Sequence, residues 1–211
     1  AALAGADAVL LAVPSQVVLD VLRRALRSVG KKTLIISVVK GLDPKTLRPV
    51  AEEILRRLPK VFKNNFVNMT GPAMAGEIAR GFPTTVEIAS PSPASARAAK
   101  NILQSPQFKV HIIKDLRGAA LCASLKNVYA ILFGMAGVLG HELNAKSELL
   151  KQIVDEMRRI PPRLGGQSKT ALSLSGLGDL LVTVMNEKSR NVTYGRLAAG
   201  RRNILSPAAL G

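Results

Sequence analysis

A change of pattern near residue 114 constrains the fold of this chain more than any other feature of its sequence. Before it, short runs rich in Val, Ile and Leu alternate with stretches of helical spacing, and after it no run is typical of a strand. The runs VLLAV and LIISVV are apolar on both faces, which indicates strands of a parallel sheet covered by helices. We therefore predict an α/β fold with a mostly parallel, doubly wound sheet, followed by an all-α region. The expected strands are 8–13, 33–39, 66–69, 84–89 and 108–113.

Three helices are expected between these strands. The first covers 15–28, and Ser15, which follows a proline, is expected to be its N-cap. The second covers 44–58, with Asp43 as N-cap and Pro44 at the first helical position. The third covers 92–103, with Pro93 in its first turn.

The second part of the chain reads as helical throughout. We expect helices over 117–140, 145–159, 175–186 and 190–199, with the segment PPRLGG at 161–166 ending the second of them. This divides the chain into residues 1–114 and residues 115–211. As written, the strand at 8–13 has no partner on one side, so we expect the sheet to be incomplete.

The chain is strongly basic, since 30 Lys and Arg residues against 14 Asp and Glu give a formal net charge of +16. Such a charge favours anionic partners, among them phosphorylated substrates and nucleotides. The basic residues are scattered in pairs, aromatic residues make up 3% of the chain, and no nucleic-acid module is recognisable. We therefore expect no nucleic-acid partner. No uninterrupted run of about 18 apolar residues occurs, so we also expect no membrane span.

The cysteine and histidine content argues against disulfide and metal chemistry. A single cysteine, Cys122, cannot form an internal disulfide, and its small apolar neighbours predict a buried, inert thiol. His111 and His141 lack metal-ligand spacing relative to Cys122 or to an acidic cluster, so we expect no metal site.

Several short segments occur in an order and spacing that is specific as a set. They are GADAVLLAVPSQ, SVVKGLD, TGPAMAGEIARGFPTTV, LKNVYAI, LNAKSEL, SLSGLGDLLVTV and KSRNVTYGRLAAG. Together they resemble the NAD(P)-dependent glycerol-3-phosphate dehydrogenase family over nearly the whole chain. The G-x-G-x-x-G fingerprint that would hold the dinucleotide, and the strand before it, do not occur in the sequence.

The resemblance implies a partial Rossmann-like NAD(P)-binding domain over 1–114 and a helical substrate and catalytic domain over 115–211. It implies reduction of dihydroxyacetone phosphate to sn-glycerol 3-phosphate with NADH or NADPH, for glycerophospholipid synthesis, by a cytoplasmic homodimer. Because the fingerprint is missing, we expect these 211 residues alone to bind dinucleotide poorly.

The resemblance also assigns the groups at the centre of the site. Lys126 resembles the lysine that donates and accepts the proton, a role that needs a pKa lowered by burial or by neighbouring cations. Lys40 resembles a lysine near the substrate and the cofactor. Asp179 matches an acid that either accepts from a substrate hydroxyl or orients Lys126. Without the motifs, the simpler interpretation would be that Lys126 is a lysine snorkelling from a helix, Lys40 a solvated loop cation and Asp179 an acid at a helix N-terminus.

The remaining assignments concern the two ends of the substrate. Gly71 resembles a substrate-contacting turn, and Ala75 matches a position that lines the cofactor. Ser189, Arg190 and Asn191 match phosphate and substrate contacts, with Arg190 also near the cofactor. A helix N-terminus and a forked guanidinium suit such an anion, although helix capping alone would also explain a serine there.

Two departures from the family pattern leave other functions open. Ala73 stands where Ser or Thr is usual, and Lys151-Gln152-Ile153 stands where an Arg-Gly step is usual. The chain could belong to a related dehydrogenase of a hydroxy acid or a sugar derivative. It could also be a non-catalytic paralogue that binds a phosphorylated metabolite.

Overall fold

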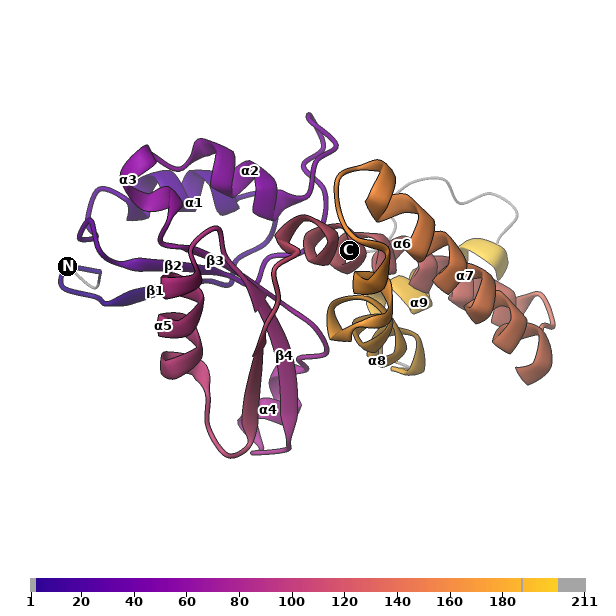
Figure 1. The fold of residues 1–211 in the computed structure, drawn as a ribbon. Coiled ribbons are helices and arrows are strands. Elements are labelled where there is room, and N and C mark those ends of the chain that lie inside the picture. The colour runs from indigo at the N-terminus through magenta and orange to yellow at the C-terminus, as the bar shows by residue number, and fades with distance from the viewer. Residues whose placement is uncertain (1–2, 187, 201–211) are drawn as a thin grey trace.

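The computed structural model describes residues 3–186 and 188–200. A five-stranded sheet with helices on both faces is followed by a group of helices beyond the end of the sheet (Figure 1). The strands are β1 (Ala8–Leu11), β2 (Leu34–Ser37), β3 (Phe66–Thr70), β4 (Thr84–Ala89) and β5 (Phe108–Ile112). All five lie within the predicted runs or differ from them by one residue, so the α/β prediction is confirmed.

The strands lie side by side in sequence order, from β1 to β5. The pairs β1–β2, β2–β3 and β4–β5 are parallel, as predicted, whereas β3–β4 is antiparallel. A parallel crossover needs about a dozen residues or more and usually a full helix. Between β3 and β4 the chain forms only the five-residue helix α4 (Ala75–Ala79), and it returns in the opposite direction. β1 forms one edge of the sheet, as expected.

Each face of the sheet has its own apolar core because successive strand residues point to opposite faces. In β2, Ile35 packs with the helices α1 (Val18–Ala25), α2 (Val50–Arg57) and α3 (Lys60–Lys63). Its neighbours Leu34 and Ile36 point to the other face, which α5 (Pro93–Leu103) covers (Figure 1). The runs that are apolar throughout are therefore strands covered on both sides.

Two of the predicted helix starts are wrong. α1 begins at Val18 without a side-chain cap, so Ser15 does not cap it. The Asp43 carboxylate accepts hydrogen bonds from the amides of Lys45 and Thr46 and closes a turn there, while Leu47 adopts a left-handed φ of 56°. A left-handed residue interrupts a right-handed helix, and α2 therefore begins only at Val50. The N-cap of α5 is Ser92, which accepts from the amide of Ser95.

The second part of the chain is helical, as predicted. Its elements are α6 (Leu116–Val138), α7 (Leu143–Arg163), the 3₁₀ turn η1 (Ser168–Leu172), the π-helical turn η2 (Leu174–Gly178), α8 (Asp179–Met185) and α9 (Arg190–Gly200). α7 continues through Pro161 and Pro162 and ends at Arg163, inside the PPRLGG segment that was expected to end it but four residues beyond the predicted end at 159. The prolines fall in the last turn and leave two carbonyls of the preceding turn without their amide donors, and the helix ends one residue after them. Residues 201–211 of the predicted second domain lie outside the described residues.

The long helix α6 joins the sheet to the other helices. Ala120 of α6 belongs to the core above β1 and β2, and Cys122 and Ala130 belong to the core shared with α7, α8 and α9. Cys122 is fully buried, and burial raises the pKa of its thiol to about 12, which fits the predicted inert cysteine. Within 3–186 and 188–200, α6 is the single helix long and apolar enough to cross a membrane. A buried core helix passes the same test, and the absence of a span stays a prediction.

Candidate functional site

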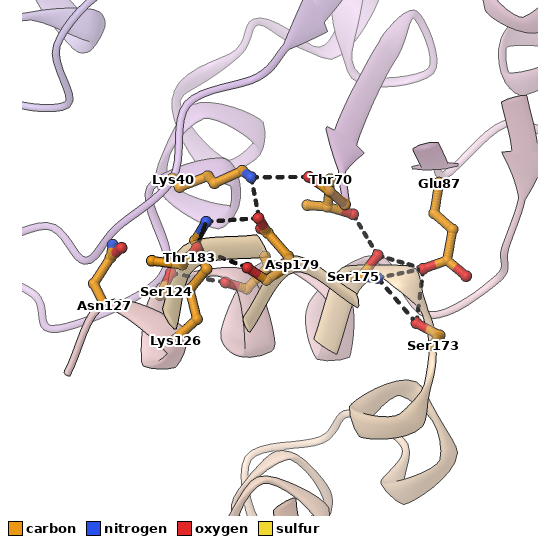
Figure 2. A network of polar contacts seen from close by, with 12 residues as sticks. Lys40, Thr70, Glu87, Ser124, Lys126, Asn127, Ser173, Ser175, Asp179 and Thr183 are labelled. Atoms are coloured by element: carbon orange, nitrogen blue, oxygen red, sulfur yellow. Dashed lines mark hydrogen bonds and ion pairs between the residues drawn. The ribbon is translucent and has the colours of Figure 1, made fainter. Parts of the chain in front are cut away.

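Two lysines and one aspartate meet where the sheet touches the helices (Figure 2). The ammonium group of Lys126 donates to Oδ1 of Asp179 at 2.6 Å, and that of Lys40 donates to Oδ2 at 2.5 Å. The Asp179 side chain is 2% exposed, and those of Lys126 and Lys40 are 10% and 25% exposed. The structure thus brings together the three residues that the sequence places at the centre of the site.

Three segments far apart in the chain supply these side chains. Lys40 follows β2 at its carboxyl end, which is where open α/β sheets bind ligands. Lys126 lies on the buried side of α6, and Asp179 is the first residue of α8, directly after the π-helical turn η2. Ser124, two residues before Lys126 on α6, donates to the Gly41 carbonyl at 3.0 Å and fixes the loop after β2 against α6.

The electrostatics of this trio favour a lysine that can release its proton. Burial lowers the pKa of Lys126, the Asp179 carboxylate raises it, and the nearby ammonium of Lys40 lowers it again. The net shift is downward. Two cations share one carboxylate, so the pair of contacts leaves one positive charge uncompensated.

Gly71 contributes its backbone to the same cluster. Its carbonyl accepts from the Lys40 ammonium at 3.1 Å, and its φ of +112° lies in the region that favours glycine. A Cβ at this position would lie 3.4 Å from Cα of Val86, so the turn also packs closely on β4. Gly71 thus contacts Lys40 in this structure, and its contact with the substrate stays a prediction.

Thr183 belongs to the cluster and was not singled out from the sequence. Its hydroxyl accepts from the Lys126 ammonium at 2.9 Å and donates to the Asp179 carbonyl at 2.7 Å. The signal that could have found it is spacing, because Thr183 follows Asp179 by four residues and shares its helix face.

The predicted phosphate contacts lie at the start of α9. Asn191 donates to the side-chain oxygen of Asn127, the residue after Lys126, at 2.9 Å. Ser189 is buried, and its hydroxyl accepts from the amide of Val192 at 3.5 Å, a long bond that caps the helix only weakly. Arg190 is the first residue of α9 and is exposed. The start of α9 is thus beside the lysine-bearing part of α6.

Ala75, the predicted cofactor-lining residue, is the first residue of α4 and is exposed. Its role stays a prediction. Among 3–186 and 188–200, no group of three or more His, Cys, Asp or Glu residues is placed to hold a metal ion.

A second polar network, which the sequence analysis missed, borders the cluster. Glu87 of β4, Thr70 of β3, and Ser173 and Ser175 around η2 are joined by short hydrogen bonds (Figure 2). No spacing in the sequence could have joined them, because they come from three separate segments.

Two family models match the chain, one to each part. The N-terminal part of NAD-dependent glycerol-3-phosphate dehydrogenase matches residues 1–96, and the C-terminal part matches residues 115–208. The chain belongs to the NAD-dependent glycerol-3-phosphate dehydrogenase family. The resemblance drawn from the ordered motifs is thereby confirmed.

Curated relatives and solved structures agree with this family. The glycerol-3-phosphate dehydrogenases [NAD(P)+] of Bacillus velezensis and Syntrophotalea carbinolica are 33% and 35% identical over 93% and 94% of this chain. The crystal structure of glycerol-3-phosphate dehydrogenase from Coxiella burnetii, 31% identical, superposes with a TM-score of 0.83 over 93% of this chain and 60% of its own. The chain spans 57% and 60% of the length of the two curated relatives.

Proposed function

We propose that the protein containing this chain reduces dihydroxyacetone phosphate to sn-glycerol 3-phosphate with NADH or NADPH, with Lys126 as proton donor and, in reverse, acceptor. One observation supports this most strongly. A buried lysine with a lowered pKa is bound to a buried aspartate that also binds a second lysine. A solvated or snorkelling lysine would have neither the burial nor these partners.

The chemistry requires a proton at the oxygen of the substrate. When bound, the dinucleotide supplies the hydride that reaches the ketone carbon. The oxygen then gains negative charge, which the Lys126 ammonium neutralises by giving up a proton. Asp179 and Thr183 hold that ammonium in one orientation, and Lys40 adds positive charge beside it.

The phosphate of the substrate is assigned to the start of α9. Its free amides, the exposed guanidinium of Arg190 and the neighbouring Ser189 and Asn191 offer donors suited to a dianion. The Asn191–Asn127 hydrogen bond ties this end of α9 to the residue next to Lys126. We propose that this bond sets the spacing between the phosphate contacts and the proton donor.

The loops that follow β1 and β2 are placed to contact the nicotinamide end of a dinucleotide. Pro14 and Ser15 follow β1, and Lys40 and Gly41 follow β2, so both loops lie at the carboxyl edge of the parallel strands. The Gly41 carbonyl is fixed by Ser124, which holds the second loop in place. We propose that these loops border the nicotinamide. The glycine-rich sequence that binds a pyrophosphate is absent from these 211 residues.

The test is turnover by the full-length protein. We expect oxidation of NADH or NADPH, followed by absorbance, when dihydroxyacetone phosphate is added. Dihydroxyacetone without its phosphate serves as the matched substrate and should react far more slowly. Binding of dihydroxyacetone phosphate without turnover would instead support a non-catalytic paralogue, and turnover only of a hydroxy acid would support a related dehydrogenase.

The other expectations belong to the same proposal. We propose a homodimer in the cytoplasm, without nucleic-acid partner or membrane span, with the division of the chain near residue 114. Size-exclusion chromatography with light scattering tests the first of these, since a monomer mass at micromolar concentration would contradict it.

A further inference from the structure

We propose that Glu87 is a positioning residue of this site: its buried carboxylate holds the turn before Asp179 and the strand end before Gly71, and so aims Asp179 at the two lysines. This inference rests on the proposed function in one respect, namely that the cluster of Lys126, Asp179 and Lys40 carries out the proton transfer. It goes beyond that function because Glu87 lies outside the motifs that carry the family resemblance and is not one of the predicted site residues.

The first argument is the number of donors that converge on one oxygen. Oε2 of Glu87 accepts from the hydroxyl of Ser173 at 2.7 Å and from the amide and hydroxyl of Ser175 at 2.8 and 2.5 Å (Figure 2). Ser175 is fully buried, and Glu87 is 6% exposed. Hydrogen bonds to an ionised carboxylate are about twice as strong as those between neutral groups.

The second argument is that the donors belong to a specific element. Ser175 is the second residue of the π-helical turn η2, whose first amides have no partner within the turn. Glu87 of β4 therefore caps η2 together with the Ser173 hydroxyl, which accepts from the same Ser175 amide at a longer distance of 3.2 Å. Asp179 follows η2 directly, so the direction in which its carboxylate points depends on how that turn is held. Single π-helical turns are frequent at functional sites.

The network also reaches the other side of the cluster. The hydroxyls of Thr70 and Ser175 are 2.5 Å apart. Because the Ser175 proton goes to Glu87, the Thr70 hydroxyl donates to Ser175. Thr70 is the last residue of β3 and precedes Gly71, whose carbonyl accepts from Lys40. The Glu87 carboxylate thus binds Ser175 before Asp179 directly and is linked through the Ser175 hydroxyl to Thr70 before Gly71.

The third argument is the cost of placing a charge there. A buried carboxylate is unfavourable unless donors compensate for lost water, and within the described part of the chain Glu87 has no ion-pair partner. Val86 and Ile88, its neighbours on β4, point to the opposite face and are fully buried in the apolar core there, whereas Glu87 faces η2. The donors that compensate the Glu87 carboxylate are Ser173 and Ser175, at the start of η2. We therefore infer that the role of Glu87 is to hold this turn in place.

The test uses two variants at this position in the full-length protein. Glu87→Val removes the acceptor, and Glu87→Gln keeps one acceptor oxygen with nearly the same shape. Glu53→Gln is the matched control, because Glu53 is also a buried carboxylate, 1% exposed, but it pairs with Arg56 and Arg57 on α2. Circular dichroism and melting temperature show which variants are folded.

The first measurement is the titration of Lys126, followed by NMR of lysines labelled with ¹³C at the ε carbon. The Lys126 signal is assigned by its loss in Lys126→Arg. The groups that face this ammonium are Asp179 from α8 and Lys40 from the loop after β2. If Glu87→Val withdraws Asp179, the pKa of Lys126 falls, because the carboxylate raises it. We expect a smaller fall in Glu87→Gln and none in Glu53→Gln.

The second measurement is steady-state kinetics. We expect kcat to fall about 10- to 100-fold in Glu87→Val, since small misplacements of reacting groups cost rates of this order, with an intermediate loss in Glu87→Gln. Ser175→Ala combined with Glu87→Val should lose little more than Glu87→Val alone, because both act through one contact.

The outcomes separate the two proposals. An unchanged Lys126 titration in folded Glu87→Val and Glu87→Gln overturns the positioning role, as does an equal shift in Glu53→Gln. If Glu87→Val does not fold, Glu87→Gln decides. If the parent shows no turnover of dihydroxyacetone phosphate, the proposed function fails, and the titration still decides the role of Glu87.

Discussion

At the residue scale, the chemistry depends on how one amine is buried. Lys126 lies on the buried side of α6, and its ammonium donates to Asp179 and Thr183 of α8, with the ammonium of Lys40 nearby. The lysine of a general acid must hold its proton in one direction of the reaction and lose it in the other, which a lowered pKa permits.

Replacing Lys126 by alanine should nearly abolish turnover. A general acid typically contributes about 10²–10⁴-fold in rate, and nothing else in the cluster can give a proton from the same place. The fold should persist, since Asp179 keeps Lys40 as its partner. Absorbance assays and circular dichroism measure both effects. Lys151→Ala is the control, because Lys151 is exposed on α7, where it pairs with Asp155. Activity within about tenfold of the parent would exclude Lys126 from this role.

Removing the charge of Asp179 should move the pH dependence of the reduction to lower pH. Reduction needs the ammonium form of Lys126, so the rate falls as pH rises through the pKa of Lys126. The Asp179 carboxylate raises that pKa, and Asp179→Asn therefore lowers it. Profiles of kcat against pH for the parent and Asp179→Asn measure the shift. Asp155→Asn changes a half-buried carboxylate of α7 that pairs with Lys151, and it should leave the profile unchanged. A shift to higher pH in Asp179→Asn would contradict the assignment.

At the element scale, α6 and α9 approach each other through glycine. A Cβ at Gly195 of α9 would lie 2.0 Å from the Ile131 carbonyl oxygen, and one at Gly134 of α6 would lie 2.2 Å from that of Val192. The clashes are with backbone, which cannot move aside without shifting a helix. This close contact determines where the start of α9, with its predicted phosphate contacts, lies relative to Lys126.

Gly195→Ala should therefore destabilise the protein and weaken substrate binding. Overpacking typically costs about 1–3 kcal/mol, and the outward shift of α9 moves Arg190 and Asn191 from the proton donor. Thermal melting and KM for dihydroxyacetone phosphate measure the two effects. Gly200→Ala, at the end of the same helix, meets no atom of residues 3–186 and 188–200 within 4 Å and should be neutral or slightly stabilising. A parent-like melting temperature for Gly195→Ala would contradict this account.

The elements themselves were largely predictable, and their ends were less so. Strand β4 and the start of α5 follow directly from apolar runs and a Ser-Pro cap. The prediction failed at Asp43, where a side chain that can cap a helix instead closes a turn. Both uses satisfy the same backbone amides, so residue type alone does not decide between them. The antiparallel return to β4 was also missed, because periodicity carries no strand direction.

At the scale of the whole molecule, the excess of basic residues should assist the capture of anions. A net charge of +16 attracts both a phosphorylated substrate and a dinucleotide, and salt screens this attraction. We expect kcat/KM for dihydroxyacetone phosphate to fall several-fold when ionic strength rises from about 0.05 to about 0.5 M, as the Debye length shortens. The same titration with uncharged dihydroxyacetone is the control. Equal salt dependence for both would assign the effect to the protein fold instead.

The site was predictable only where its residues lie in recognisable motifs. Lys40, Lys126 and Asp179 were found because each belongs to an ordered segment of the family. Thr183 lies in one of these segments but was not singled out, and Glu87 lies just beyond another, since the importance of both comes from what the folded chain places beside them. Spacing from Asp179 was the one local signal for Thr183, whereas a carboxylate within a strand, such as that of Glu87, has no local pattern that distinguishes it from many others.

Lys40 and Asp179 are 139 residues apart in the sequence and meet where the sheet and the helices touch. Any loosening of that junction separates them while the secondary structure on either side remains intact. Loss of activity in dilute urea should therefore precede loss of the helical circular-dichroism signal, because local opening needs less free energy than global unfolding. The interval between the two midpoints would measure how firmly the two halves are held together.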